Sequence, residues 1–135
     1  NNDSEVIVWG SGKVKRDFLH IDDMAKASLF VFDLSKETYQ RHTKTMLSHI
    51  NIGTGQEITI CELAETVKKV VGFNGLLKFD LDKPDGTMRK MVDTSKLSNM
   101  GWTYGIKLED GLKRTYDWFL KIKESSDFQD QSFPP

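Results

Sequence analysis

Two turns of the sequence combine cations with side chains that suit a flat or anionic ligand. Trp9 leads into the glycine turn 10–12 and Arg16 follows it, while a second turn holds Asp85 and then Arg89. An arginine can grip a diphosphate through two parallel hydrogen bonds, and a tryptophan can stack on a ring. A carboxylate accepts hydrogen bonds from hydroxyl or ring N–H groups. These four residues are the candidate binding set, although such residues are also common on ordinary surfaces.

Two glycine turns resemble phosphate-binding loops without meeting their requirements. If Gly12 and Lys13 were the end of a P-loop, its first glycine would be at position 7, which is Ile7. The hydroxyl that binds magnesium would be at position 14, which is Val14. The turn 53–55 lies between a strand-like and a helical segment, but Ile58 replaces the third glycine of a dinucleotide fingerprint. A structural turn is therefore the favoured interpretation of 53–55, and no cofactor-binding residue is assigned.

No catalytic or metal-binding residue can be assigned from the remaining polar groups. The three histidines do not combine with Cys61 in a zinc-binding spacing. His20 is expected to be a hydrogen-bonded structural residue. Asp22 and Asp23 could form a catalytic pair, but adjacent acids ahead of an apolar helix more often cap it.

The overall composition excludes several classes of partner. The 135 residues include 19 basic and 20 acidic side chains, so no net field recruits nucleic acid or an anionic membrane. No apolar run approaches the roughly 20 residues that cross a bilayer. Cys61 is the only cysteine, which is typical of a reducing compartment and favours a cytoplasmic location.

The elements that must position these groups alternate between strands and helices. Strands are predicted at 5–9, 18–21, 49–52 and 76–79, the first two forming a hairpin about the glycine turn. A largely buried helix is predicted at 24–36, capped by Asp22 or Asp23 and followed by a surface loop to residue 44. The pattern Thr59–Glu62 is a capping box for a helix that ends at Gly72.

The last third of the sequence continues the same alternation. Residues 83–86 form a turn, a short helix capped by Asp93 or Thr94 ends at Gly101, and a final helix covers 108–121. From residue 124 the sequence is polar and is expected to be a frayed tail. An α/β layer arrangement follows, with few short strands and three to four helices. So few strands indicate a part of a larger protein.

The segments around the candidate residues resemble a known family. The run Val8–Gly12 followed by Arg16–Ala25 is similar to extended short-chain dehydrogenase/reductase proteins that act on sugar nucleotides. Within that group Met46–Gly55, Lys83–Thr87 with Arg89 and Lys90, and Gly101 with Trp102 resemble the GDP-L-fucose synthase family. The likeness covers about residues 5–123.

The resemblance implies a function for the candidate residues. The family converts GDP-4-keto-6-deoxy-D-mannose to GDP-L-fucose by epimerisation at C3 and C5 and NADPH-dependent reduction at C4. Trp9, Arg16 and Asp85 occupy its substrate-binding positions, with Arg16 on the diphosphate, and Arg89 is added by extension. Residues 1–123 would form the sugar-nucleotide-binding domain and 124–135 the tail.

The sequence also departs from the family in its catalytic residues. The family reduces its substrate with a Tyr-x-x-x-Lys pair, but Tyr39, Tyr104 and Tyr116 are followed at the fourth place by Thr43, Leu108 and Leu120. NADP would therefore bind to an amino-terminal Rossmann domain outside this chain. The full-length protein is expected to be a homodimer. The isolated chain is expected to be inactive. A non-enzymatic sugar-nucleotide-binding module and a part of another nucleotide-sugar epimerase or dehydratase remain the alternatives.

Overall fold

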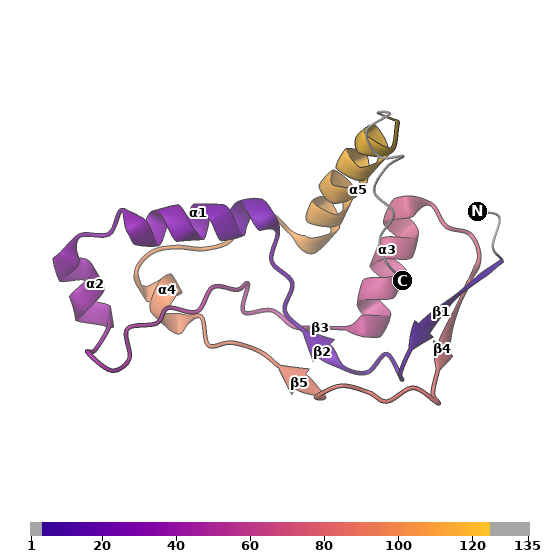
Figure 1. Ribbon diagram of the computed structural model, residues 1–135, viewed down its shortest axis with the longest axis horizontal. Coiled ribbons are helices and arrows are strands. Elements are labelled where there is room, and N and C mark those ends of the chain that lie inside the picture. The colour runs from indigo at the N-terminus through magenta and orange to yellow at the C-terminus, as the bar shows by residue number, and fades with distance from the viewer. Residues whose placement is uncertain (1–3, 125–135) are drawn as a thin grey trace.

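The computed structural model describes residues 4–124, which form a mixed α/β structure. Helices α1, α2 and α4 lie at one end of the long axis and the strands β1 and β4 at the other (Figure 1). The strands are β1 Glu5–Trp9, β2 Lys15–Arg16, β3 Ile58–Thr59, β4 Leu76–Asp80 and β5 Arg89–Lys90. The helices are α1 Ile21–Phe32, α2 Lys36–His42, α3 Ile60–Val71, α4 Ser95–Asn99 and α5 Leu108–Glu124. The described part thus has five helices rather than the three to four predicted.

Two small sheets replace the predicted hairpin. β1 pairs in parallel with β4, from Glu5 opposite Leu76 to Trp9 opposite Asp80. β2 pairs with β3 and β5 in a second sheet of order β3-β2-β5. The predicted strand 18–21 is wrong, because residues 18–20 form a loop and Ile21 begins α1. Left-handed backbone at Gly10 (φ +82°) and Gly12 (φ +72°) directs the chain from one sheet into the other instead of folding it back.

Helix α1 starts three residues earlier than predicted and has a different cap. The Nδ1 atom of His20 accepts the backbone N–H of Asp22 at 3.2 Å, so His20 is the N-cap and neither aspartate is. His20 is a hydrogen-bonded structural residue, as predicted, but not in a strand. Asp23 is instead buried, with 2% of its surface exposed, and its Oδ2 accepts the backbone N–H groups of Gly105 and Ile106. It thereby joins α1 to the segment that precedes α5.

The prediction that this helix is largely buried is wrong within the described residues. Ala27 is fully buried, but Ile21, Leu29 and Phe32 are 76%, 63% and 85% exposed. α1 therefore carries one apolar side packed on this chain and a second apolar side that faces outward. Beyond it, a second helix replaces the predicted surface loop, because the Oγ of Ser35 accepts the N–H of Thr38 and starts α2.

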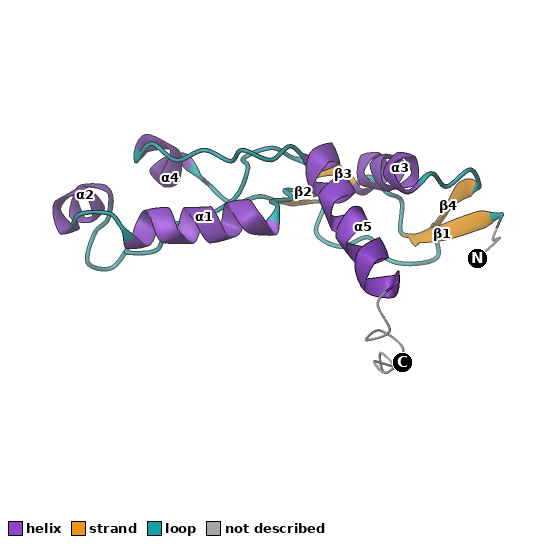
Figure 2. Ribbon diagram, turned by 90° about the horizontal axis from the view of Figure 1, so that it is seen from above, coloured by secondary structure: helices purple, strands orange, loops and turns teal. Residues whose placement is uncertain are grey.

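Helix α3 forms as the sequence predicts. Thr59 accepts the N–H of Glu62 while the Glu62 carboxylate accepts the N–H of Thr59, and Gly72 closes the helix at φ +70°. α3 packs against α5, and the two lie side by side in both views (Figures 1 and 2). An exposed ion pair of 2.7 Å between Lys69 and Glu109 also links them.

The capping box makes stability depend on pH. Hydrogen bonds from the Thr59 backbone and side chain hold the pKa of Glu62 below its ordinary value of 4.5. A carboxyl whose folded pKa is lowered stabilises the fold above its unfolded pKa, and this contribution disappears as pH falls through the folded pKa. We expect Glu62→Gln to unfold at a lower denaturant concentration than wild type at pH 7, with a difference that shrinks below pH 4.5. A control, Glu65→Gln on the same helix, should show a smaller difference; an equal effect in both variants would contradict this role.

The other predicted elements have mixed outcomes. Strand 76–79 is confirmed as β4, and the last helix is confirmed with an end at Glu124. The short helix is confirmed as α4, which the Asp93 carboxylate supports by accepting the N–H of Ser95 at 2.9 Å. The predicted strand 49–52 is wrong, because it pairs with no strand in the described part of the chain. Of the predicted tail 124–135, all but Glu124 lies outside the described residues.

Candidate functional site

Three of the four candidate residues line one small polar pocket. Trp9 ends β1, Arg16 ends β2, and Asp85 lies in the loop between β4 and β5, yet all three face a cavity of about 190 Å³. The rest of its lining comes from the same turns and from the start of α3, namely Gly12, Val14, Ile60, Pro84 and Gly86. Residues that are 76 positions apart in the sequence are thus brought together where the two sheets meet.

The backbone explains why these segments converge. Because β1 and β4 are parallel, both strands end at the same edge of the sheet. There the N–H of Gly10 donates to the carbonyl of Asp80 at 2.9 Å. A methyl group at Gly10 would lie 2.5 Å from Oδ1 of Asp85, so only glycine permits this approach. The loop then returns through β5, which pairs with β2 beside Arg16.

The carboxylate of Asp85 is bound on both oxygens by one residue. The N–H of Ser11 donates to Oδ1 at 2.8 Å, and the Ser11 hydroxyl donates to Oδ2 at 2.6 Å. These two bonds, the side-chain bond first, hold the pKa of Asp85 below its ordinary range. The pocket therefore presents a fixed anionic acceptor at neutral pH.

Arg16 supplies a cation that no acid within residues 4–124 neutralises. It is half-buried, and its Nη1 donates to the carbonyls of Lys15 and Thr87 at 2.6 and 2.8 Å. Within residues 4–124 no carboxylate lies within 4.0 Å of its guanidinium. The backbone bonds fix the position of the planar group while its charge is left for an anion.

Trp9 offers one face of its ring to a ligand. The side chain is 74% exposed, and the ammonium group of Lys83 lies 5.5 Å from the ring centroid. A cation over one face is a favourable arrangement that restricts the ring's rotation. Much of the ring surface remains exposed and can stack on a ligand. Sequence reasoning did not select Lys83 or Ser11, since neither type signals a site without its neighbours in space.

Arg89 lies outside the pocket. Its Nε donates to Oε1 of Glu57 at 2.7 Å, and this bond raises the pKa of the guanidinium. The Glu57 side chain is 12% exposed, so the pair links β5 to the residue before β3, across the central strand β2. The structure thus separates Arg89, which has a carboxylate partner, from Arg16, which has none among the described residues.

The second glycine turn is structural, as predicted. The Asp17 carboxylate accepts the backbone N–H groups of Thr54 and Gly55 at 3.0 Å and also the Thr54 hydroxyl. Those N–H groups are the ones a phosphate would need. Asp17 already accepts them, and the described residues contain no cluster of His, Cys, Asp or Glu able to hold a metal ion.

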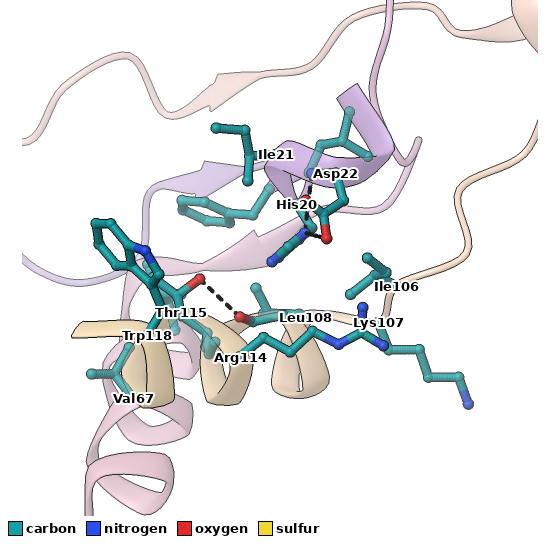
Figure 3. A pocket seen from close by; sticks show the side chains of 15 residues that line it. His20, Ile21, Asp22, Val67, Ile106, Lys107, Leu108, Arg114, Thr115 and Trp118 are labelled. Atoms are coloured by element: carbon teal, nitrogen blue, oxygen red, sulfur yellow. Dashed lines mark hydrogen bonds and ion pairs between the residues drawn. The ribbon is translucent and has the colours of Figure 1, made fainter. Parts of the chain in front are cut away.

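A second, apolar cavity lies apart from this pocket. It measures about 840 Å³ and lies between residues 18–22, which lead into α1, and the helices α3 and α5 (Figure 3). Ile21, Val67, Leu108 and Trp118 point toward it. His20 also lines it. Its Nδ1 atom accepts the backbone N–H of Asp22 and lies 3.6 Å from Oδ2 of the same residue. None of the four candidate binding residues lines this cavity.

Comparisons with known proteins show which proteins this chain resembles. Residues 1–53 match the model of the NAD dependent epimerase/dehydratase family. The chain is 53% identical over 123 residues to GDP-L-fucose synthase of Escherichia coli, covering 91% of this chain and 38% of that protein. The chain thus spans about a third of the length of the curated relatives that it matches.

Solved structures give the same result. A GDP-6-OMe-4-keto-L-xylo-heptose reductase from Campylobacter jejuni matches with a TM-score of 0.79 and 39% identity, over 88% of this chain and 34% of that one. A GDP-L-fucose synthetase from Naegleria fowleri bound to NADP matches with a TM-score of 0.75 and 28% identity, over 90% and 36%. The proteins to which the chain is similar are GDP-L-fucose synthases and related GDP-sugar reductases.

The described residues also include no helix long and apolar enough to cross a membrane.

Proposed function

We propose that this chain forms the sugar-nucleotide-binding part of an enzyme with GDP-L-fucose synthase activity. The observation that carries the proposal is the half-buried cation Arg16, which faces the same pocket as Trp9 and Asp85 and has no carboxylate partner in the described chain. The relatives named GDP-L-fucose synthase support the choice of a GDP-sugar. A cation without an acid beside it is the arrangement that an anionic ligand needs.

Each side chain has a role that its geometry supports. Arg16 would bind the diphosphate, because its guanidinium is held by backbone carbonyls and keeps its charge. Trp9 would stack on a ring of the ligand through the face away from Lys83. Asp85 would accept hydrogen bonds from ligand hydroxyl or ring N–H groups. Arg89 is excluded from direct contact by its pairing with Glu57.

The chemical steps would take place on residues outside this chain. The proposed reaction inverts C3 and C5 of GDP-4-keto-6-deoxy-D-mannose and reduces its C4 ketone with a hydride from NADPH. Within residues 4–124 the Tyr39 hydroxyl donates to the Ser48 carbonyl at 2.7 Å, and neither Tyr104 nor Tyr116 has a lysine four places on. We therefore assign NADP binding and catalysis to a separate domain of the full-length protein, which we propose to be a cytoplasmic homodimer.

The surface of the chain supports such a second domain. The outward apolar side of α1, with Ile21 and Phe32, and the apolar cavity beside Trp118 leave much hydrophobic area in water. Monomeric proteins rarely expose patches of this kind. The relatives are about three times longer than the matched segment, which provides enough chain to cover them. Residues 1–123 would remain the substrate-binding domain.

Calorimetric titration of the 135-residue chain with GDP, GDP-mannose and UDP tests the proposal. We expect both guanine nucleotides to bind and UDP to bind more weakly. Absence of heat with all three would contradict binding by this chain, and a preference for UDP would favour another nucleotide-sugar epimerase. In the full-length protein, conversion of the 4-keto sugar with NADPH consumption separates an enzyme from a non-catalytic binding module.

A further inference from the structure

The turn between β1 and β2 contains a serine whose hydroxyl is oriented from two sides. The N–H of Lys13 donates to Oγ of Ser11 at 3.2 Å, and the Ser11 hydroxyl donates to Oδ2 of Asp85 at 2.6 Å. Because the ionised Asp85 carboxylate can only accept, the Ser11 hydroxyl is the donor in this bond, while its oxygen accepts from Lys13. The direction of this hydrogen bond is therefore defined.

The same turn also aims the backbone of Ser11. The left-handed conformation of Gly10 and Gly12 on either side presents the Ser11 N–H to Oδ1 of Asp85 at 2.8 Å. A carboxylate has about four lone-pair sites, of which Ser11 uses one on each oxygen. One site on each oxygen is left for a ligand.

The loop that carries Asp85 has little else to fix its side chains. Every residue from Leu81 to Lys90 is exposed. Among the described residues, two other side-chain contacts join this loop to β1 and β2. Arg16 donates to the carbonyl of Thr87, and Lys83 lies over the Trp9 ring. Burial therefore does not hold the Asp85 carboxylate in place; hydrogen bonds must do so.

We propose that Ser11 is a positioning residue of the sugar-nucleotide site, which acts through Asp85 by fixing both of its carboxylate oxygens toward the ligand. The proposal rests on the proposed function of the pocket. Ser11 makes no contact with the ligand of its own in this arrangement. Its effect on affinity must therefore depend on the presence of the carboxylate, and this dependence is what an experiment can measure.

A double-mutant cycle provides the first test. We expect Ser11→Ala to weaken GDP-mannose binding by about threefold to tenfold, the effect of losing one hydrogen bond to a charged group. In an Asp85→Ala background the same change should have no further effect. Ser11→Thr, which keeps the hydroxyl, should restore binding, and Ser98→Ala, an exposed serine on α4, is the matched control. Additive effects of the two alanine variants would overturn the proposal, because Ser11 would then act independently of Asp85.

A measurement without ligand separates this proposal from the proposed function. Titration of the Asp85 carboxyl carbon by NMR should give a higher pKa in Ser11→Ala than in wild type, because the hydroxyl bond that favours the ionised form is lost. An unchanged pKa would overturn the proposal even if GDP-mannose binds. If the wild-type chain binds no nucleotide, the proposed function fails, and the titration still decides whether Ser11 holds Asp85.

Discussion

Replacing Arg16 with alanine is expected to weaken GDP binding by about 100-fold. Its guanidinium is the half-buried cation of the pocket without a carboxylate partner in the described chain, and two charge-assisted hydrogen bonds to a diphosphate are worth about two decades of affinity. Calorimetric titration with GDP measures the change. Arg16→Lys keeps the charge but loses the planar fork, so we expect a loss of about tenfold.

Arg89→Ala is the matched control for this prediction. Arg89 carries the same charge a few residues from the pocket but is paired with Glu57. Its removal should change GDP affinity by less than about threefold, the effect of a screened charge outside the contact. Because Arg16 also donates to the carbonyl of Thr87, the unliganded melting temperature of each variant must be compared. Equal losses of affinity in the two variants would contradict the assignment of the diphosphate to Arg16.

Replacing Asp23 with alanine is expected to destabilise the fold by about 3 kcal/mol. The carboxylate is 2% exposed and its Oδ2 accepts two backbone N–H groups, from Gly105 at 3.0 Å and from Ile106 at 2.7 Å. The buried N–H of Ile106, left without an acceptor, costs about 1–3 kcal/mol, and the part-buried N–H of Gly105 adds to this. Chemical denaturation measures the free energy of unfolding. Asp23→Asn retains an acceptor oxygen of the same shape and should cost less.

The adjacent acid provides the control for this second prediction. The Asp22 side chain is 57% exposed, so Asp22→Ala should change stability by less than about 1 kcal/mol. A loss in Asp22→Ala as large as that in Asp23→Ala would show that the acids act through the start of the helix rather than through the buried bonds. GDP affinity should be unchanged in both variants as long as they remain folded, because neither residue lines the pocket.

Elements that depend on neighbouring residues could be predicted from the sequence. Helix α3 has its capping box, its apolar spacing and its glycine end within one stretch of chain, and all three are present in the structure. Helix α5 is also present where its apolar spacing predicts it, although it ends at Glu124 rather than at residue 121. These signals are local because a cap, a helical turn and a left-handed glycine each involve residues no more than a few positions apart.

Elements that depend on distant partners could not be predicted from the sequence. The sequence predicts the strand 5–9 correctly but not its partner, which is 76–80 rather than 18–21, because strand propensity does not specify which strand pairs with which. The exposure of one side of α1 could not be predicted for the same reason, since an apolar pattern does not show whether another segment packs on it. Asp22 and Asp23 are likewise identical in type and differ only in what the fold brings to them.

For the candidate site, the sequence by itself determined the chemistry available: the ring of Trp9, the charge of Arg16 and the carboxylate of Asp85, in segments that resemble GDP-L-fucose synthases. Only the tertiary structure decided which of the candidate residues belong together. It placed those three in one pocket, paired Arg89 with Glu57 outside it, and added Ser11 as the residue that holds Asp85. The physical reason is that a residue's type fixes the charge and the hydrogen bonds it can offer, whereas the fold fixes whether a neighbouring side chain has already used them.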